Sequence, residues 1–344
     1  EQYGATVVLC TATQPALEER TGFPGLPGIR EIVPNAAQLF TTLKRVEYDW
    51  PAPGETVTWN EIAAEMRQTP QALAIVNTRA DAADLLVALD EPGALHLSTR
   101  MCGAHRRAVL ADARSRLARN EPCRLVATQL IEAGVDIDFP LVLRALGPLD
   151  RIVQSAGRCN REGKLTGTLG RVRIFVPEGR HMPSGVYRTG TELTAGLLNA
   201  QPDLHDPSVY SEYFRELYRQ IDPDEKRVQD VRRSLDYPAV AERFKLIEDD
   251  TNPVVVLYGD DAVQQTSRDH LARLRTHQGR ARDLLRALQP YIVGLRPKEL
   301  SHAQAAGKVE EVMPGLWEWK GMYDTEQGRG IVLDAPVDPA RLIW

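Results

Sequence analysis

Short apolar runs alternate with helical patterns over the first two-thirds of the chain. Seven apolar runs have the length of buried strands, at residues 6–10, 43–48, 72–76, 94–97, 124–127, 142–145 and 171–176. Helical patterns lie between them, at residues 60–68, 79–89, 102–119 and 151–159. Because parallel strands need a crossover helix between them, we predict an α/β fold, with a parallel sheet covered by helices on both faces.

The last third follows another pattern. Beyond residue 176 the alternation stops, and an apolar helical face lies at residues 209–218. A mixed stretch follows, with an apolar run at 254–258 and a basic helix at 267–289. We therefore predict a smaller α+β accessory domain that covers residues 228–344.

These patterns divide the rest of the chain into three parts. Residues 29–185 would form the main sheet domain, and residues 186–227 a linker with one helix. Residues 1–28 hold one apolar run and a stretch rich in Gly and Pro, which we interpret as the end of a preceding domain and a connector. Since the sequence lacks an initiator Met, we expect it to belong to a longer protein.

The composition is that of a soluble globular protein, with 43% hydrophobic and 26% charged residues among 344. No apolar run approaches the ~20 residues that cross a bilayer, so we predict no membrane partner. The four cysteines, Cys10, Cys102, Cys123 and Cys159, are too widely spaced for a zinc motif. We expect free thiols in a reducing cytoplasm and no metal bound by this chain.

The formal charge of −5 is unevenly distributed. Residues 100–124 and 144–173 each carry seven basic and two acidic residues, whereas residues 203–261 carry fifteen acids and eight bases. Phosphate groups respond to the local field, so the basic segments are candidates for binding nucleic acid. Solvated helix faces explain them equally well.

The segment 154–161 reads Q-S-A-G-R-C-N-R and lies in a predicted helix after a strand. Arg158 and Arg161 are three residues apart, so we expect both to project from one helical face, with Gln154 on the same side. Gly157 would let another backbone approach closely. Two guanidinium groups on a rigid face suit the γ-phosphate of a nucleotide held by another domain. The simpler alternative is a surface helix with two salt-bridged arginines.

About twenty residues earlier, segment 126–138 reads V-A-T-Q-L-I-E-A-G-V-D-I-D and also follows a predicted strand. Gly134 permits a tight turn, and Asp136 can accept hydrogen bonds from a ribose. Thr128 at the strand end can donate to a phosphate. An ordinary strand and loop with a capping Asp is the alternative, but the spacing before the arginine segment favours a binding site.

These two segments resemble motifs V and VI of superfamily 2 helicases. The sequence of residues 126–139, V-A-T-Q-L-I-E-A-G-V-D-I-D-F, closely resembles the corresponding segment of the CRISPR-associated helicase–nuclease of type I systems. Further segments agree in order, since L-C-T-A-T-Q-P at 9–15 resembles motif III and I-V-N-T-R at 75–79 resembles motif IV. L-S-T-R-M at 97–101, with His105-Arg106, resembles the strand-contacting motif of this family.

The resemblance implies roles for individual residues. Arg161 would be the arginine finger, Arg158 the second phosphate contact, and Gln154 their catalytic neighbour. Gly134, Asp136 and Gly157 would line the nucleotide side of the cleft. The residues expected to contact nucleic acid are Asn77, Thr78, Ser98, Thr99, Arg100, Arg106, Thr128 and Gln129. Those expected to couple the nucleotide state to the grip on the strand are Thr11, Ala12 and Thr13.

Other parts of such an enzyme are not found in this sequence. It has no G-x-x-x-x-G-K-[ST] loop and no D-E-x-H box, and His205-Asp206 is an H-D pair by composition only. ATP with Mg²⁺ would therefore be bound mainly by a first lobe outside this sequence. The divalent transition metal would belong to an HD nuclease domain that is also outside it.

The resemblance implies a RecA-like second motor lobe of an ATP-dependent translocase that moves 3′-to-5′ on single-stranded DNA. The enzyme would unwind and degrade target DNA in CRISPR interference, an antiviral defence, after recruitment by an RNA-guided surveillance complex. Two alternatives stay open: a general superfamily 2 DNA or RNA helicase, and a non-catalytic module that binds DNA or the surveillance complex. We predict that this chain alone does not hydrolyse ATP.

Overall fold

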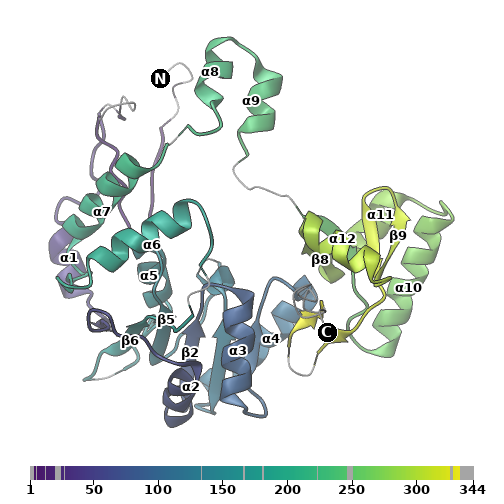
Figure 1. The fold of residues 1–344 in the computed structure, drawn as a ribbon, viewed down its shortest axis with the longest axis horizontal. Coiled ribbons are helices and arrows are strands. Elements are labelled where there is room, and N and C mark those ends of the chain that lie inside the picture. Colours follow the sequence, from purple (N-terminus) through teal and green to yellow (C-terminus); the bar gives the residue numbers. More distant parts are fainter. Residues whose placement is uncertain are drawn as a thin grey trace, which may run out of the picture. The chain divides into compact units, whose positions relative to one another are not determined.

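The computed structural model divides the chain into two compact units (Figure 1). We call them the N-terminal unit, formed by Glu1–Pro92 and Asn120–Phe244, and the C-terminal unit, formed by Gly93–Arg119 and Lys245–Trp344. The structure describes residues 4–333 except residues 5, 12, 20–24, 27, 133, 166, 180–181, 223, 246–250 and 326–327.

The sheet at the centre of the N-terminal unit has the strand order β1-β6-β5-β2-β4, and β3, which continues this order, belongs to the C-terminal unit. The strands are β1 (Val46–Asp49), β2 (Gln71–Ile75), β3 (Leu95–Leu97), β4 (Cys123–Ala127), β5 (Leu141–Ala145) and β6 (Gly170–Phe175). The first five strands in this order are β1, β6, β5, β2 and β4, and each pairs in parallel with its neighbours among these five. Each overlaps a predicted strand within three residues, so the predicted parallel α/β sheet is confirmed.

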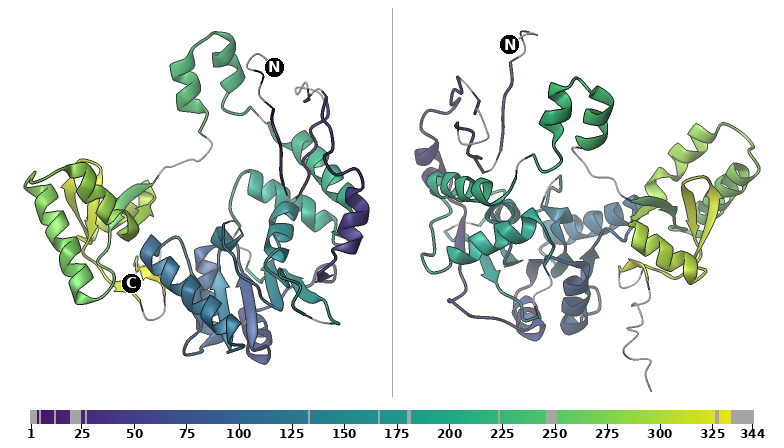
Figure 2. Two further views of the ribbon diagram at one scale, coloured as in Figure 1. Left: turned by 180° about the vertical axis from the view of Figure 1, so that it is seen from behind. Right: turned by 45° about the horizontal axis from the view of Figure 1, so that its top comes forward.

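Helices cover this sheet on both faces (Figure 2). The helices α2 (Trp59–Gln68) and α3 (Arg79–Leu89) pack against each other, and each begins with a capping box, at Thr58 and Thr78. The helices α5 (Leu149–Ala156), α6 (Val186–Gly196) and α7 (Pro207–Gln220) share a second apolar cluster with the end of β6. Because both faces are covered, all five residues of β5 are buried.

Three further helices of the N-terminal unit are short. They are α1 (Ala36–Thr42), which the sequence did not predict, α8 (Val228–Arg233) and α9 (Tyr237–Arg243). The helices α8 and α9 pack on each other and belong to this unit, although we expected the accessory domain to begin at residue 228.

The C-terminal unit contains a four-stranded sheet in the order β8-β7-β10-β9. These strands are β7 (Asn252–Val255), β8 (Ile292–Leu295), β9 (Val309–Met313) and β10 (Leu316–Trp319). Side chains on one face, such as Val255, pack with α10 (Asp261–Arg275) and α11 (Ala281–Leu288). The neighbouring Val254 and Val256 belong to the opposite cluster, with α12 (Pro297–Ala305) and Cys102.

The predicted smaller α+β region is therefore present. It also includes a short hairpin of β11 (Tyr323–Asp324) and β12 (Gly330–Ile331), and by packing it includes β3 with α4 (Gly103–Ala118). Within the described ranges, no helix is both long enough and apolar enough to cross a membrane.

Two predictions of secondary structure were wrong. Residues 6–10 form no strand, and Val7 is 78% exposed, because no described strand lies beside this segment to share its hydrogen bonds. The predicted single helix at 267–289 is two helices, α10 and α11. The first of these helices ends at Arg275, just before His277, whose φ of +51° lies in the left-handed region that ends helices.

Two buried histidines link α4 and β3 to the rest of the C-terminal unit. His105 is 3% exposed, stacks on Tyr258 with ring centroids 4.7 Å apart, and has its Nδ1 atom 3.0 Å from the Tyr323 hydroxyl. His96 is 6% exposed, and the charges of Asp324 and Arg329 act on it. Burial lowers the pKa of each imidazole to about 4, so both are neutral at pH 7.

Lowering the pH from 7.5 to 5 should destabilise the C-terminal unit. A histidine in the unfolded chain has a pKa of about 6.5. As the pH falls, the unfolded chain therefore binds protons at a higher pH than the folded chain does. The stability from neutral His96 and His105 is complete above about pH 6.5 and is lost as the pH falls towards 4, by about 2 kcal/mol for each at pH 5. Urea unfolding at the two pH values measures the difference.

In a His105→Gln variant the free energy of unfolding should depend less on pH than it does in the wild-type chain. In His277→Gln, a variant of an exposed histidine, the pH dependence should equal that of the wild-type chain. Equal free energies of unfolding at pH 7.5 and pH 5 for the wild-type chain would contradict this assignment.

Candidate functional site

The carboxyl ends of β2 and β4 bring together four residues that the sequence predicted to contact nucleic acid. Asn77 and Thr78 follow β2, and Thr128 and Gln129 follow β4. The Gln129 side-chain amide donates to the Asn77 carbonyl oxygen over 2.8 Å, so the two segments are joined. Ligands of open α/β sheets bind at this edge, where the carboxyl ends of the strands meet.

The helix α5 is shorter than predicted. It ends at Ala156, so Arg158 and Arg161 do not lie on one helical face, and this part of the prediction was wrong. The chain turns away because Phe139 donates to the Arg158 carbonyl oxygen over 2.9 Å and accepts from the Asn160 amide over 3.0 Å. Asn160 takes a φ of +45°, a conformation that asparagine tolerates.

Arg158 points into the protein. It is 7% exposed, and its Nε and Nη2 atoms donate to the carbonyl oxygens of Ile131 and Glu132 over 2.9 and 2.6 Å. These bonds fix the segment after β4. The expected contact between Arg158 and a phosphate stays a prediction, and it requires some of these bonds to open.

Arg161 points outwards, and its guanidinium Nε lies 2.8 Å from an Asp136 carboxylate oxygen. The two side chains are 44% and 71% exposed. Asp138 fixes the backbone beneath them, since its carboxylate accepts from the amides of Arg161 and Glu162. The residue before this loop, Gly134, has a φ of +70°, in agreement with a tight turn. Two residues expected at the nucleotide thus lie side by side.

The other residues expected near the nucleotide lie at the end of α5. The Gln154 side-chain oxygen accepts from Arg151 over 3.4 Å. A Cβ atom on Gly157 would come closest to the carbonyl oxygens of Gln154 and Val153, which belong to the preceding turn. Gly157 therefore serves the end of the helix, and we find no close approach of another described segment there.

The group Ser98, Thr99, Arg100 and Arg106 belongs to the C-terminal unit. Ser98 is buried and its hydroxyl accepts from the Arg100 amide over 3.1 Å, while the Arg100 guanidinium lies 3.4 Å from Glu299. Thr99 is exposed and Arg106 is half-buried. Thr99 and Arg106 are therefore the members of this group that are most open to a nucleic-acid backbone.

Two of the predicted coupling residues, Thr11 and Thr13, form hydrogen bonds with each other. The Thr11 hydroxyl accepts from the Thr13 amide over 3.2 Å and lies 2.9 Å from the Thr13 carbonyl oxygen; Ala12 lies outside the described residues. His205 and Asp206 have structural contacts, with the backbone of Val46 and with the first turn of α7. In the part of the chain that the structure describes, no three His, Cys, Asp or Glu side chains gather closely enough to hold a metal ion.

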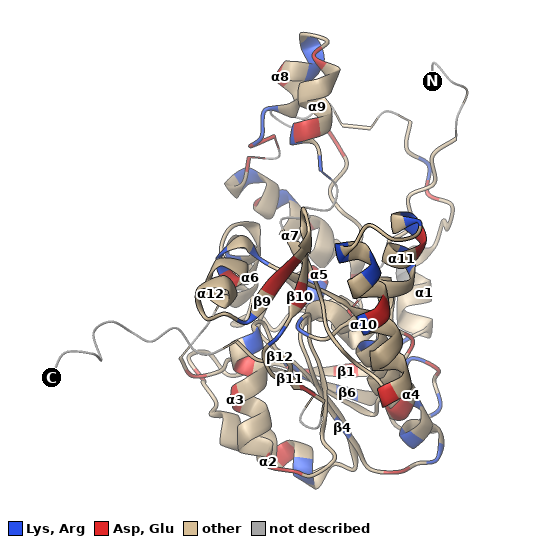
Figure 3. Ribbon diagram, turned by 90° about the vertical axis from the view of Figure 1, so that its right-hand side faces the viewer, with Lys and Arg blue, Asp and Glu red and all other residues tan. Residues whose placement is uncertain are grey.

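Many arginines of the two basic segments are paired with acids. Arg116 binds Asp112, Arg124 binds Glu91, and Arg171 lies between Asp49 and Glu65. Figure 3 shows that basic and acidic residues also occur together along the helices of the C-terminal unit. The surfaces formed by the two basic segments therefore carry less net positive charge than a count of their own residues suggests.

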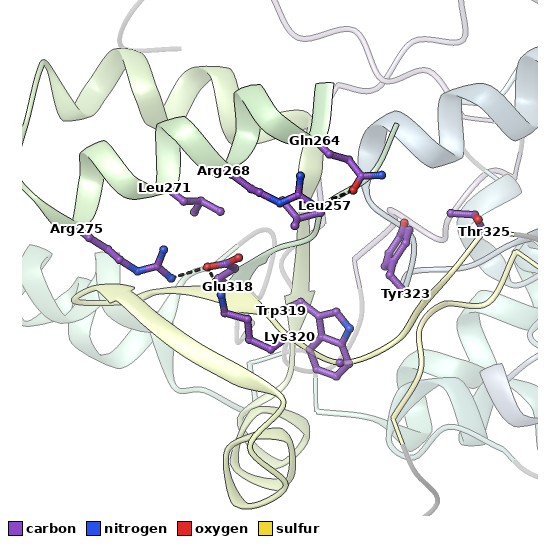
Figure 4. Close-up of a pocket in the computed structure, with 11 residues that line it drawn as sticks. Leu257, Gln264, Arg268, Leu271, Arg275, Glu318, Trp319, Lys320, Tyr323 and Thr325 are labelled. Atoms are coloured by element: carbon purple, nitrogen blue, oxygen red, sulfur yellow. Dashed lines mark hydrogen bonds and ion pairs between the residues drawn. The ribbon is translucent and has the colours of Figure 1, made fainter. Parts of the chain in front are cut away.

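The C-terminal unit carries a polar groove of about 670 Å³ beside α10 and β10 (Figure 4). Its floor holds the buried Glu318, whose carboxylate lies 2.5 Å from Arg275 and 2.9 Å from Lys320. Arg268 lies on one wall and donates to Gln264 over 3.3 Å. The pairing with Glu318 neutralises part of the positive charge of this groove.

The sequence analysis missed a buried network at the same sheet edge as Asn77. Arg144, near the end of β5, and Glu132, after β4, form a fully buried ion pair of 3.1 Å. Burial raises the pKa of the Glu132 carboxyl, and the guanidinium groups of Arg144 and Arg151 oppose this shift. The only signal in the sequence was one arginine inside an apolar run.

Residues 68–164 match the family model described as CRISPR-associated nuclease/helicase Cas3, C-terminal. Over 40 residues the chain is 60% identical to the CRISPR-associated nuclease/helicase Cas3 of Haloferax volcanii, which covers 12% of this chain and 4% of that protein. Residues 68–164 therefore resemble the C-terminal region of Cas3. Over these residues, the resemblance that the sequence suggested is confirmed.

Solved structures agree with this Cas3-like fold. The crystal structure of a CRISPR-associated protein matches with a TM-score of 0.53 at 18% identity, over 85% of this chain and 41% of that chain. T. fusca Cas3 with AMPPNP matches with a TM-score of 0.50 at 16% identity, over 80% and 39% of the two chains. This chain thus matches less than half of the length of each of these solved relatives.

Matched methionine variants should separate the inward from the outward arginine. Arg158→Met leaves two buried carbonyl oxygens without donors, so the free energy of unfolding should fall by about 2–4 kcal/mol. Arg161→Met breaks an exposed ion pair, which is worth at most about 1 kcal/mol. Urea unfolding of both variants measures this. Similar losses in the two variants would contradict the opposite orientations.

Proposed function

We propose that the Cas3-like chain supplies the second motor lobe of an ATP-driven translocase on single-stranded DNA, and that Arg161 is its arginine finger. The observation that carries the proposal is the exposed pair of Arg161 and Asp136, held on a backbone that Asp138 and Arg158 fix from below. An exposed pair of this kind exchanges its partner at little cost in free energy. The guanidinium can bind a γ-phosphate through two parallel hydrogen bonds, and a terminal phosphate carries more negative charge than one carboxylate.

In this proposal the nucleotide is ATP with Mg²⁺, held mainly by another lobe that carries the phosphate loop. Arg161 would leave Asp136 for the γ-phosphate, and the Asp136 carboxylate would then accept hydrogen bonds from the ribose hydroxyls. Gln154 and Gly134 would border the same cleft. The T. fusca relative was solved with AMPPNP, an analogue of ATP, which supports nucleotide use in this family.

Single-stranded DNA would bind through its backbone. The exposed Thr99 and half-buried Arg106 of the C-terminal unit are candidate contacts, as are Thr78 and Gln129 at the sheet edge of the N-terminal unit. Contacts from such side chains to phosphate and sugar carry no sequence information, as movement along any sequence requires.

The whole enzyme would unwind and degrade DNA in CRISPR interference. Its nuclease metal would be held by a separate HD domain, and an RNA-guided surveillance complex would recruit it. The family match of residues 68–164 supports this assignment over a general superfamily 2 helicase. Movement from 3′ to 5′ is part of the proposal.

The arginine-finger role can be tested in a protein that joins this chain to its phosphate-loop lobe. Arg161→Ala should lower the rate of ATP hydrolysis by about 10³ or more, because charge on the transferred phosphoryl group loses its partner. The affinity for ATP should change little. Arg219→Ala, which removes an exposed arginine paired with Glu216 on α7, is the matched control and should hydrolyse ATP at the wild-type rate. Wild-type turnover by Arg161→Ala would remove Arg161 from the site.

The isolated 344 residues should not hydrolyse ATP, with or without single-stranded DNA, because the sequence has no phosphate loop. Phosphate release measured on the purified chain tests this. DNA-stimulated hydrolysis by the chain alone would show that its nucleotide site has been misassigned. Salt-dependent DNA binding without any role in hydrolysis in the joined protein would instead favour a non-catalytic module.

A further inference from the structure

Arg144 occupies an unusual position, near the carboxyl end of the buried strand β5 and with no exposed surface. A buried guanidinium loses its hydration, and apolar residues of similar size often stabilise such a site as well or better. A charge at this position therefore calls for a reason other than stability of the sheet.

The guanidinium joins segments that are far apart in sequence. Its Nη1 atom donates to the Asn77 side-chain oxygen over 2.8 Å, and its Nη2 atom donates to the Glu132 carboxylate over 3.1 Å. Nη2 also lies 3.0 Å from the hydroxyl of Tyr187 on α6. That hydroxyl donates in turn to the Asn77 side-chain oxygen over 2.7 Å. Arg144 and Tyr187 thus hold the turn after β2 from two sides.

Glu132 carries the network on to α5. Its carboxylate accepts from the Ser155 hydroxyl over 3.4 Å and lies 3.6 Å from Arg151, while its carbonyl oxygen accepts from Arg158. A continuous set of hydrogen bonds therefore runs from Asn77, which precedes the candidate DNA contact Thr78, to the segment that presents Arg161. Arg144 links the two halves of this set, in addition to the hydrogen bond between Gln129 and Asn77.

The surrounding backbone leaves room for this link. A Cβ atom on Gly147 would lie 2.9 Å from Arg144 Nη2 and 2.9 Å from the Tyr187 hydroxyl, closer than such atoms come in proteins. Any larger residue at 147 would displace one of these two groups. The sheet edge is thus shaped around the network.

We propose that Arg144 is a positioning residue that couples the DNA-contacting turn at Asn77 to the nucleotide-side segment at Glu132 and α5. This inference rests on the proposed function. Lysine keeps the positive charge at position 144, but it cannot span Asn77 and Glu132 with the planar fork of a guanidinium. The charge alone is therefore not sufficient for the coupling.

The test uses the protein that joins both motor lobes and measures ATP hydrolysis with and without saturating single-stranded DNA. In Arg144→Lys the ratio of DNA-stimulated to basal hydrolysis should fall at least tenfold. Tyr187→Phe removes one hydroxyl and keeps the ring, so the ratio should fall about threefold. Arg171→Met removes an exposed arginine of the neighbouring strand β6 and should leave the ratio unchanged. Thermal unfolding of each variant shows whether it is folded.

A folded Arg144→Lys or Tyr187→Phe variant with the wild-type ratio would overturn the coupling role. If Arg144→Lys does not fold, Tyr187→Phe alone decides between a reduced ratio and an unchanged one. A wild-type protein whose hydrolysis is not stimulated by DNA would instead overturn the proposed function, and this inference with it.

Discussion

The parallel register of β2 with its two neighbours, β4 and β5, fixes the positions of the candidate site residues in the N-terminal unit. Ile75 lies opposite Ala127 of β4 and opposite Arg144 of β5. The segments that follow β2 and β4 must therefore emerge side by side at one edge of the sheet. The hydrogen bonds between Asn77, Gln129 and Leu146 follow from this register. Because β2 and β5 are buried, the register cannot slip without exposing apolar side chains.

Two arginines three residues apart serve opposite needs at this edge. Arg158 is buried and holds the loop after β4, whereas Arg161 is exposed on the neighbouring turn and forms an ion pair with Asp136. Two backbone hydrogen bonds join Phe139 to Arg158 and Asn160, and the turn that they fix directs the side chains of Arg158 and Arg161 to opposite sides. The backbone of Arg161 is fixed by Asp138, while its guanidinium is exposed. An arginine that contacts a ligand held by another lobe needs both features, because its geometry relative to the ligand must be maintained.

The strands of the large sheet could be predicted from sequence because burial on both faces turns them into continuous apolar runs. The end of α5 could not be predicted, because it depends on Phe139, about twenty residues away, and no periodicity within the helix reports that contact. The apolar run at 6–10 was misread for a related reason, since a strand exists only beside another strand. Arg144 was missed because a single charge in an apolar run gives no sign of its partners.

The candidate site was predicted in part. The residues after β2 and β4 do meet, and Arg161 does lie beside Asp136, because their order in the sequence follows the order of the parallel strands. The inward turn of Arg158 depends on carbonyl groups, which side-chain identity does not reveal. Residues that the sequence grouped together are thus neighbours where strand topology decides the geometry, and they point apart where backbone hydrogen bonds decide it; their roles stay predictions.

The most direct measurement is a structure of the joined motor with ADP and a fluoride analogue of the transferred phosphoryl group. The account predicts that the ion pair of Arg161 with Asp136 is open and that the Arg161 guanidinium lies about 3 Å from the analogue. An analogue bound without any contact to Arg161, with that side chain still on Asp136, would contradict the central claim.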